Sequence, residues 1–230
     1  MFKTLKLEDD ILNHEIFKLA FVHKSSSIQH NNERLEYLGD AVLQLTISAN
    51  VSNIFHSATE GELTRIRAKL VNTLFLSKKC QDELLHKHIQ VSKGTENLEQ
   101  SKKDKIYAGL LEAVIGAIFQ IKGWDYSKQF LETLFKQELK NISMRDAKKD
   151  PKTELQEYLQ KYKFQLPIYD FVEDKDNNLF ECKVTYNGIT YQSKQAIKKL
   201  AEQEVAQMIL DNLDSWKRQN VVTCLLLVSQ

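Results

Sequence analysis

The chain has 230 residues, which is enough for one or two domains with a sizeable hydrophobic core. Hydrophobic residues make up 42% and charged residues 27% of it, as in ordinary soluble proteins, and only 2 prolines and 7 glycines argue against a loop-rich or all-β chain. The net charge of +1 does not point to a polyanionic partner, so any nucleic-acid surface must come from local clustering of basic side chains.

The spacing of the cysteines and the length of the apolar segments further restrict the class of protein. Cys80, Cys182 and Cys224 are widely spaced without a C-x-x-C pair, which argues against a disulfide framework and against a cysteine zinc site. The start, MFKTLKLEDD, has the composition of neither a secretory signal nor a transit peptide, and the late apolar run VVTCLLLV is far too short to span a membrane. We therefore expect a cytoplasmic protein with no membrane partner.

Residues 1–140 predict one helix after another. Apolar side chains recur at helical spacing in IFKLAFVH, RLEYLGDAVLQL, LTRIRAKLVNTLFLSKKC and IYAGLLEAVIGAIF. Short polar breaks separate these segments. A further helix is expected from about residue 126 to residue 140.

Three carboxylates crowd one of these helices, NNERLEYLGDAVL. Glu33, Glu36 and Asp40 share one stripe, because each helical residue advances by about 100°, and such like charges repel by a few tenths of a kcal/mol per pair. Glu112 adds a carboxylate in the otherwise apolar helix GLLEAVIGAIF, where an unpaired charge is costly. A hard cation such as Mg²⁺, which prefers oxygen ligands, would offset the repulsion. The alternative is a solvated helix face, with Glu33 paired to an adjacent arginine or a nearby lysine.

Other familiar catalytic motifs are missing. The sequence has no H-E-x-x-H, Walker loop or G-x-S-x-G, so zinc proteases, P-loop nucleotide hydrolases and α/β-hydrolases lose their main support. A carboxylate-bridged di-iron bundle needs two E-x-x-H motifs, and the lone copy from Glu83 to His86 is disfavoured as such a site.

A polar stretch at residues 141–152 is the best candidate for a linker. It lacks periodicity and closes with Asp150 and Pro151, a good N-cap followed by proline at the first helical position. The expected divisions are a first domain at residues 1–145, a second at residues 150–213 and an unassigned C-terminal tail at residues 214–230.

After a helix at residues 153–163 the pattern changes to period two. The segments IYDFVE, LFECKVTY and ITYQSKQ predict strands, and Asn187 with Gly188 is a strong signal for a two-residue hairpin turn. A last helix is expected to carry on one side Ile197, Ala201, Val205, Met208 and Ile209. The predicted fold class is therefore α+β, with an all-helical domain followed by an α-β-β-β-α domain.

These segments resemble, in order, the ribonuclease III family of double-strand-specific RNA endonucleases. NERLEYLGDAVL is similar to the family's signature helix, and LAFVHKSS, EGELTRIRAKLV and GLLEAVIGAIF resemble its other motifs. DPKTELQEYLQ and KKLAEQEVA resemble the first and last helices of a double-stranded-RNA-binding domain. The resemblance covers about residues 10–212. It implies a homodimeric endoribonuclease that uses Mg²⁺, or Mn²⁺ as a substitute, leaves 5′-phosphate and 3′-hydroxyl ends, and works in rRNA and other RNA processing.

The resemblance carries roles to particular residues of the helical domain. The metal-binding carboxylates fall on Glu36, Asp40 and Glu112, and Asp40 and Glu112 are the expected catalytic residues. Glu33 and Glu60 match acidic positions that contact the substrate near the scissile strand.

Two positions in this domain depart from the family pattern. Gly109 stands where the family has a metal-binding aspartate, which favours as an alternative a double-stranded-RNA-binding protein with impaired cleavage. Tyr37 replaces the usual phenylalanine of the dimer contact, and its alternative is a core aromatic. A third possibility, a helical phosphohydrolase for small phosphorylated substrates, is disfavoured because no His-Asp dipeptide is present and the second domain would then have no task.

The second domain matches RNA-contacting positions less closely. A-form RNA is read mainly through phosphates and 2′-hydroxyls, so modest polar and basic groups suffice. The matching residues are Thr153, Gln156, Glu157, Lys194, Lys198 and Lys199. Lys198 and Lys199 are expected to clamp phosphate at a helix N-terminus, and their alternative is a solvated face. The acidic loop EDKDNN replaces the usual G-P-x-H and should repel phosphate, so we expect a lower RNA affinity than typical, with Lys194 partly compensating.

Overall fold

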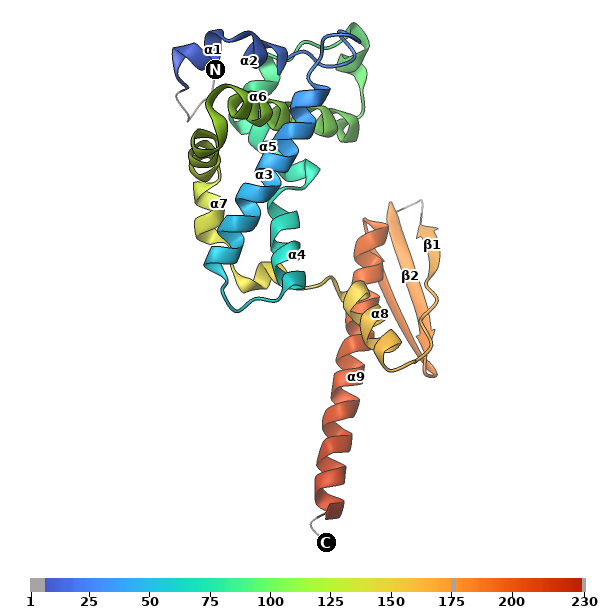
Figure 1. Cartoon of the computed structure of the whole chain (residues 1–230). Coiled ribbons are helices and arrows are strands. Elements are labelled where there is room, and N and C mark those ends of the chain that lie inside the picture. The colour runs from blue at the N-terminus through green and yellow to red at the C-terminus, as the bar shows by residue number, and fades with distance from the viewer. Residues whose placement is uncertain (1–6, 175–176, 229–230) are drawn as a thin grey trace. The chain divides into compact units, whose positions relative to one another are not determined.

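The structure is a computed structural model that describes residues 7–174 and 177–228, without the side chains of residues 96 and 214–228. The chain forms two compact units, Met1–Lys148 and Lys149–Gln230 (Figure 1). Because their relative placement is not determined, each unit is described by itself.

All the regular elements among the described residues of the first unit are helices, and one isolated β-bridge joins Val22 to Gln90. The unit's helices are α1 (Asp9–Asn13), α2 (Glu15–Leu19), α3 (Glu33–Ile54), α4 (Glu60–Leu70), α5 (Thr73–Asp82), α6 (Gln100–Leu134) and α7 (Lys136–Asn141). Its short 3₁₀ turns are η1 (Leu85–Lys87), η2 (Lys93–Asn97) and η3 (Met144–Ala147). The all-helical prediction is confirmed.

Helix α6 forms the centre of this unit and packs against α2, α3 and α5. Its residues from Leu110 to Ile118 are buried except for Glu112, so the helix is apolar on nearly all sides. By length and composition it is the one helix among the described residues that could cross a membrane, but 56% of its most apolar window is buried inside the protein. It is therefore the core helix of the unit.

Helices α3 and α6 cross with their backbones in contact. A Cβ atom on Gly39 would lie 1.7 Å from the carbonyl oxygen of Glu112, and a Cβ atom on Gly116 would lie 2.1 Å from that of Leu35. Only glycine permits so close an approach of two backbones. This crossing fixes where Glu36 and Asp40, each the next residue after a contact point on α3, meet α6.

The end of α6 differs from the sequence prediction. Gly123 has φ 77° and ψ −169°, which lie outside the helical region. A residue with a side chain would be strained in this conformation, and the helix is interrupted at this glycine. The helix expected at residues 126–140 is thus found as the end of α6 and, after Phe135, as α7. The turn η3 is fastened to α4, since Arg65 Nε donates to the carbonyl oxygen of Ala147 at 2.6 Å.

The second unit is an antiparallel sheet with two helices. Its elements are α8 (Pro151–Lys161), β1 (Asp170–Asp174), β2 (Leu179–Tyr186), β3 (Ile189–Gln195) and α9 (Lys198–Val228), with strand order β1-β2-β3. Cys182 pairs with Phe171 on one side and with Ser193 on the other. The core lies between the sheet and the helices and contains Leu155, Leu159, Cys182, Val184, Ala201, Val205, Ala206 and Ile209. The predicted α+β fold class is confirmed.

Local signals in this unit were accurate at the turn and at the first cap. Asn187 and Gly188 both have positive φ, 49° and 77°, and connect β2 to β3 as predicted. The side chain of Asp150 accepts from the backbone N–H of Thr153 at 3.1 Å, with Pro151 at the first helical position. The predicted apolar side of the last helix is buried at Ala201, Val205 and Ile209. It was wrong at Ile197, which precedes α9 and is 57% exposed, and at Met208, which is 38% exposed.

Candidate active site

The α3–α6 crossing gathers three carboxylates. Glu36 and Asp40 come from α3 and Glu112 from α6, and all three side chains are half-buried. Burial, together with the charges of Asp40 and Glu36, raises the pKa of Glu112 to about 8. The sequence prediction that these residues lie on two facing helices agrees with this placement, since α3 and α6 pack together and the charges of Asp40 and Glu36 reach Glu112.

Two of these carboxylates, on Glu36 and Glu112, lack a positively charged partner. Neither group makes a hydrogen bond or an ion pair with any residue that the structure describes. Burial raises the pKa of Glu36, the nearby charge of Lys24 lowers it, and Glu33 and Asp40 raise it further. Asp40 accepts a hydrogen bond at Oδ1 from Gln44 Nε2 at 3.2 Å. Half-buried carboxylates without partners are unfavourable in their charged form, so their pKa values rise and they tend to keep their protons unless a positive charge joins them.

The cluster is open and its atoms suit a hard cation. Among the described residues, the fully buried side-chain oxygens without a hydrogen-bond partner belong to Asn32 and Glu138, so the oxygens of Glu36 and Glu112 are not enclosed. No three or more His, Cys, Asp or Glu side chains in the described ranges are already gathered tightly enough to hold a metal ion. The donor set fits one chemically, because it consists of carboxylate oxygens on flexible side chains that can converge.

Gly109 lies one helical turn before Glu112 and is buried. A Cβ atom at this position would lie 2.8 Å from Cδ and Oε2 of Glu36 and 2.9 Å from its Oε1. The carboxylate of Glu36 therefore fills the space that a side chain on residue 109 would take.

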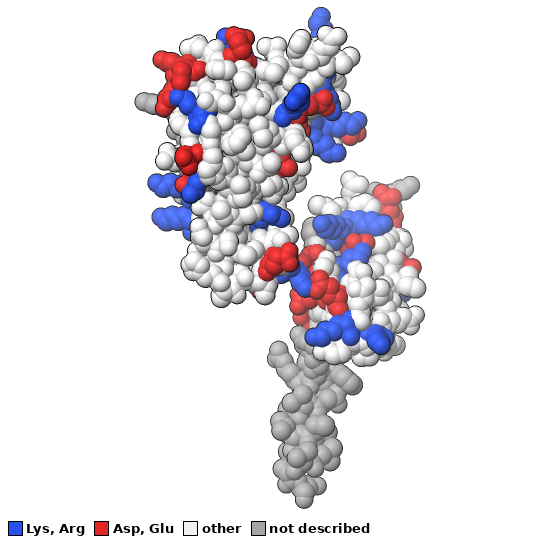
Figure 2. All heavy atoms as spheres, viewed as in Figure 1, with Lys and Arg blue, Asp and Glu red and all other residues white. Residues whose placement is uncertain are grey.

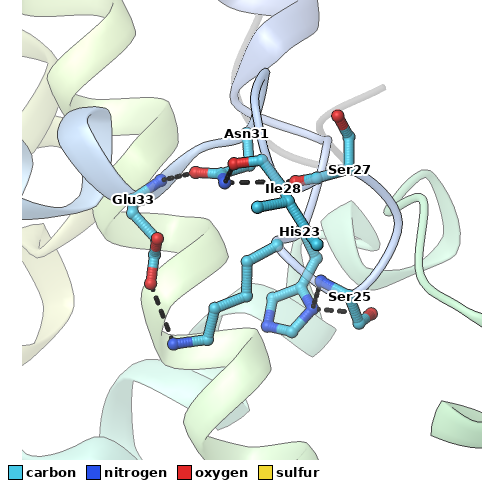
Figure 3. Close-up of polar contacts among 7 residues, drawn as sticks. His23, Ser25, Ser27, Ile28, Asn31 and Glu33 are labelled. Atoms are coloured by element: carbon cyan, nitrogen blue, oxygen red, sulfur yellow. Dashed lines mark hydrogen bonds and ion pairs between the residues drawn. The ribbon is translucent and has the colours of Figure 1, made fainter.

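Glu33 stands apart from the other carboxylates of its stripe. Its side chain is exposed, and Lys24 Nζ lies 2.8 Å from its Oε1. In Figure 3 a dashed line joins the carboxylate of Glu33 to the unlabelled lysine side chain. The loop that carries Lys24 is held in place, because Ser25 Oγ lies 2.9 Å from His23 Nδ1 and accepts from the backbone N–H of Ser92 at 3.1 Å. The structure therefore contains the alternative expected for Glu33, an exposed carboxylate paired with a nearby lysine.

Glu60 lies elsewhere in the single chain. It is the first residue of α4 and lines a hollow of about 280 Å³ between α3 and α4, together with Ser48, Leu63 and Arg67. The structure therefore does not bring Glu60 into the cluster of Glu36, Asp40 and Glu112.

The middle of the exposed side of α3 is apolar, whereas Glu33 and Arg34 at its start are charged. Tyr37 is 81% exposed and Leu45 is 57% exposed, so Tyr37 is not a core aromatic in the single chain. Figure 2 shows that much of the face over which α3 runs in Figure 1 is uncharged, with charged side chains mainly toward its margins. Exposed apolar side chains of this size are typical of a surface that another molecule covers.

In the second unit, the matched positions of α8 are all on the surface. Thr153, Gln156 and Glu157 are exposed, and Glu157 forms an ion pair with Lys149. Thr153 Oγ1 donates to Asp150 Oδ2 at 2.7 Å, so its hydroxyl is oriented at the helix start.

The three lysines of this unit differ in their surroundings. Lys198 begins α9 with its Nζ 4.0 Å from the ring centroid of Phe171, a cation–π contact that orients it. Burial alone would raise the pKa of Asp150, but hydrogen bonds from Thr153 and the charge of Lys199 lower it, which places Lys199 near the start of α8. Lys194 is ion-paired with Glu181 at 3.0 Å across β2 and β3.

Comparisons with known proteins agree with both units. The family model described as Ribonuclease-III-like matches residues 13–139, and the double-stranded RNA binding motif matches residues 151–213. A protein called Ribonuclease 3 from Pasteurella multocida is 34% identical over 204 residues, covering 86% of this chain and 90% of the relative. Another, from Methylococcus capsulatus, is 33% identical over 211 residues, covering 90% of this chain and 91% of the relative.

Solved structures show the same likeness. The nuclease domain of ribonuclease III from Campylobacter jejuni is 34% identical, with a TM-score of 0.52, and the match covers 58% of this chain and 91% of that one. The structure of Dicer from Pichia stipitis is 25% identical, with a TM-score of 0.51, and covers 91% of this chain and 98% of that one.

A helical nuclease domain with open carboxylates, joined to an α-β-β-β-α domain that binds double-stranded RNA, defines an endoribonuclease acting on RNA duplexes. The disfavoured alternative of an enzyme for small phosphorylated substrates is thereby set aside. The chain belongs to the ribonuclease III family.

Sequence reasoning did not find four residues that shape these sites. Gly39 and Gly116 make the helix crossing, and glycine inside a helical pattern was the available signal for a close approach. For Glu33 the sequence analysis expected a nearby lysine without identifying Lys24. Phe171 contacts Lys198 from another part of the sequence, for which no local pattern exists.

Proposed function

We propose that this endoribonuclease hydrolyses double-stranded RNA with a divalent cation, Mg²⁺ or in its place Mn²⁺, held by Glu36, Asp40 and Glu112. The products are 5′-phosphate and 3′-hydroxyl ends. The observation that supports this proposal is the pair of half-buried carboxylates on crossing helices, Glu36 and Glu112, with no ion-pair partner among the described residues. A divalent cation is the group that such oxygen donors accept.

The chemistry divides between the cation and the chain. When bound, a divalent cation activates a water molecule at neutral pH and neutralises charge that develops on the phosphate oxygens. Asp40 and Glu112 are the catalytic residues of the proposal, and they approach from opposite helices. Glu112, with a pKa raised to about 8 in the metal-free protein, would hold the cation in its carboxylate form, its proton having passed to solvent. Glu33, which is ion-paired with Lys24, and Glu60 on α4 contact the substrate outside the cation site.

The second unit holds the duplex. Thr153, Gln156 and Glu157 present polar groups to a minor groove from the exposed side of α8, and Lys198 and Lys199 contact phosphates at the start of α9. Lys194 contributes less than the sequence prediction gave it, because Glu181 already neutralises it.

The active form is a homodimer in which Tyr37 enters the partner. The exposed ring of Tyr37 and the apolar middle of the exposed side of α3 support this arrangement. The similar nuclease domain from Campylobacter jejuni, which has the same fold, is structurally flexible in a region involved in its dimer formation. We place the enzyme in the cytoplasm, in the processing of rRNA and other transcripts.

One comparison tests the proposal directly. A long RNA duplex is incubated with Mg²⁺ and the native chain, Glu112→Gln or Gly109→Asp, and cleavage is followed on a denaturing gel with end-group analysis. We expect cleavage by the native chain, loss of cleavage in Glu112→Gln, and 5′-phosphate ends. The isosteric glutamine removes the charge and leaves the fold, so its loss of activity reports on the carboxylate.

The same comparison separates the alternative in which Gly109 impairs cleavage. A native chain that binds the duplex and leaves it intact, while Gly109→Asp cuts it, would establish a double-stranded-RNA-binding role in place of the nuclease. Cleavage by the native chain that Glu112→Gln leaves unchanged would refute the proposed cation site.

A further inference from the structure

The glycine at residue 109 has no backbone reason to be glycine. It lies inside α6 among residues of helical conformation, where glycine is a poor helix former. Gly39 and Gly116 differ from it, because a Cβ atom on either would collide with backbone atoms. At Gly109 the three nearest atoms all belong to one flexible side chain, the carboxylate of Glu36.

The carboxylate of Glu36 thus lies against the place where a Cβ atom on Gly109 would be. Gly109 itself is one turn before Glu112 on α6. The side chain of Glu36 is half-buried there and has no hydrogen bond or ion pair with a described residue. The nearby charge of Lys24 is felt at Glu36, but the ammonium is hydrogen-bonded to Glu33 and makes no hydrogen bond or ion pair with Glu36. A carboxylate seated against a helix, unpaired and beside Glu112, is placed to bind a cation.

We propose that Glu36, reaching over from α3, occupies the cation-binding position that a carboxylate on residue 109 would fill, and that Gly109 is the positioning residue that leaves room for it. This inference rests on the proposed cation-dependent function. Any side chain at residue 109 displaces the Glu36 carboxylate, but only one that carries its own carboxylate replaces what is lost.

Mn²⁺ binding to the full-length chain without RNA tests this inference independently of activity. Free Mn²⁺ is measured by electron paramagnetic resonance during titration of the native chain, Gly109→Ala, Gly109→Asp and Glu112→Gln. We expect Gly109→Ala to lower the affinity about 10- to 100-fold, the range typical when a metal ligand loses its positioning partner. Gly109→Asp should bind at least as tightly as the native chain.

Folding is measured separately as the melting temperature in EDTA. Gly109→Ala should melt no lower than the native chain, because alanine favours the helix and the three atoms nearest to its Cβ belong to a movable side chain. Gly94→Ala is the matched control, since a Cβ atom there meets nothing within 4 Å, and it should change neither measurement.

Three results would overturn the inference, and a fourth would overturn the proposed function on which it rests. Gly109→Ala with native Mn²⁺ affinity, or Gly109→Asp as weak as Gly109→Ala, means that Glu36 does not use this position. Adding Glu36→Gln to Gly109→Asp should cost less affinity than adding it to the native chain, and an equal cost also rejects the inference. Native Mn²⁺ binding that is no tighter than that of Glu112→Gln instead removes the proposed cation site itself.

Discussion

Replacing Gly39 with alanine should destabilise the first unit, because the new Cβ atom would collide with the backbone of α6. The new Cβ atom would lie 1.7 Å from the carbonyl oxygen of Glu112, 2.7 Å from its carbonyl carbon and 2.8 Å from the backbone nitrogen of Gly116. Ordinary contacts between carbon atoms are about 3.5 to 4.0 Å, so the helices must separate by roughly 1.5 to 2 Å at this point. All three neighbours are backbone atoms, and no rotamer change relieves the clash.

The cost follows from opposing effects. Overpacking of a core typically costs about 1 to 3 kcal/mol, and a clash between two helix backbones belongs at the upper end. Alanine in place of glycine in a helix interior returns about 1 kcal/mol. We therefore expect Gly39→Ala to lower the free energy of unfolding by about 2 kcal/mol. The variant should also bind Mn²⁺ more weakly, because the carboxylates of the site come from both helices.

Urea denaturation of the full chain, followed by far-ultraviolet circular dichroism, measures this change. Gly94→Ala serves as the control for an added methyl group in open space, and Gly116→Ala should resemble Gly39→Ala because its Cβ would lie 2.1 Å from the carbonyl oxygen of Leu35. Equal stability of Gly39→Ala and Gly94→Ala would refute the inferred backbone contact.

Three further predictions concern charge. In metal-free buffer the free energy of unfolding should fall between about pH 5 and pH 8, because Glu112, with a pKa raised from 4.5 to about 8, keeps its proton in the folded state after the unfolded chain has lost it. The upper limit is about 1.4 kcal/mol per pH unit, reduced by partial exposure to about 1 to 2 kcal/mol in all, and Glu112→Gln should flatten the fall. Lys198→Ala with Lys199→Ala should weaken duplex binding and reduce the slope of log affinity against log salt by about 2. Glu181→Gln should strengthen duplex binding a few-fold by freeing Lys194 from its ion pair.

Each of these has a contrary outcome. A pH dependence that Glu112→Gln leaves intact would locate the titrating group elsewhere. An unchanged salt slope in the double lysine variant would mean that Lys198 and Lys199 do not contact phosphate. Weaker duplex binding by Glu181→Gln at unchanged melting temperature would mean that Glu181, and not Lys194, takes part in binding.

Local chemistry made much of the fold predictable. The positive φ values of Asn187 and Gly188 are dictated by a two-residue hairpin, and the cap at Asp150 satisfies a backbone N–H of the first turn, so both could be read from a few neighbouring residues. The break at Gly123 was missed because a glycine in a helical pattern predicts a weaker helix and not a particular dihedral angle.

The candidate site was predictable in its residues and not in its arrangement. The residue spacing predicted that Glu36 and Asp40 lie on one side of a helix. In the structure both are close enough to Glu112 for their charges to raise its pKa, as that prediction requires. The position of the Glu36 carboxylate against Gly109 depends on how closely α3 and α6 cross, which is a property of the tertiary structure. The pairing of Lys194 with Glu181 follows from strand register, which sets neighbours that lie 13 residues apart in the sequence.

The backbone contact at Gly39 and Gly116 also determines how the site can move. Amide hydrogens at such a contact are shielded by the core of the unit, so they should exchange with solvent only in openings that break α3 away from α6. The carboxylates of Glu36, Asp40 and Glu112 belong to these two helices and not to a loop. Local fraying elsewhere in the chain therefore leaves their spacing intact, and the cluster disperses only when the most protected part of the domain opens.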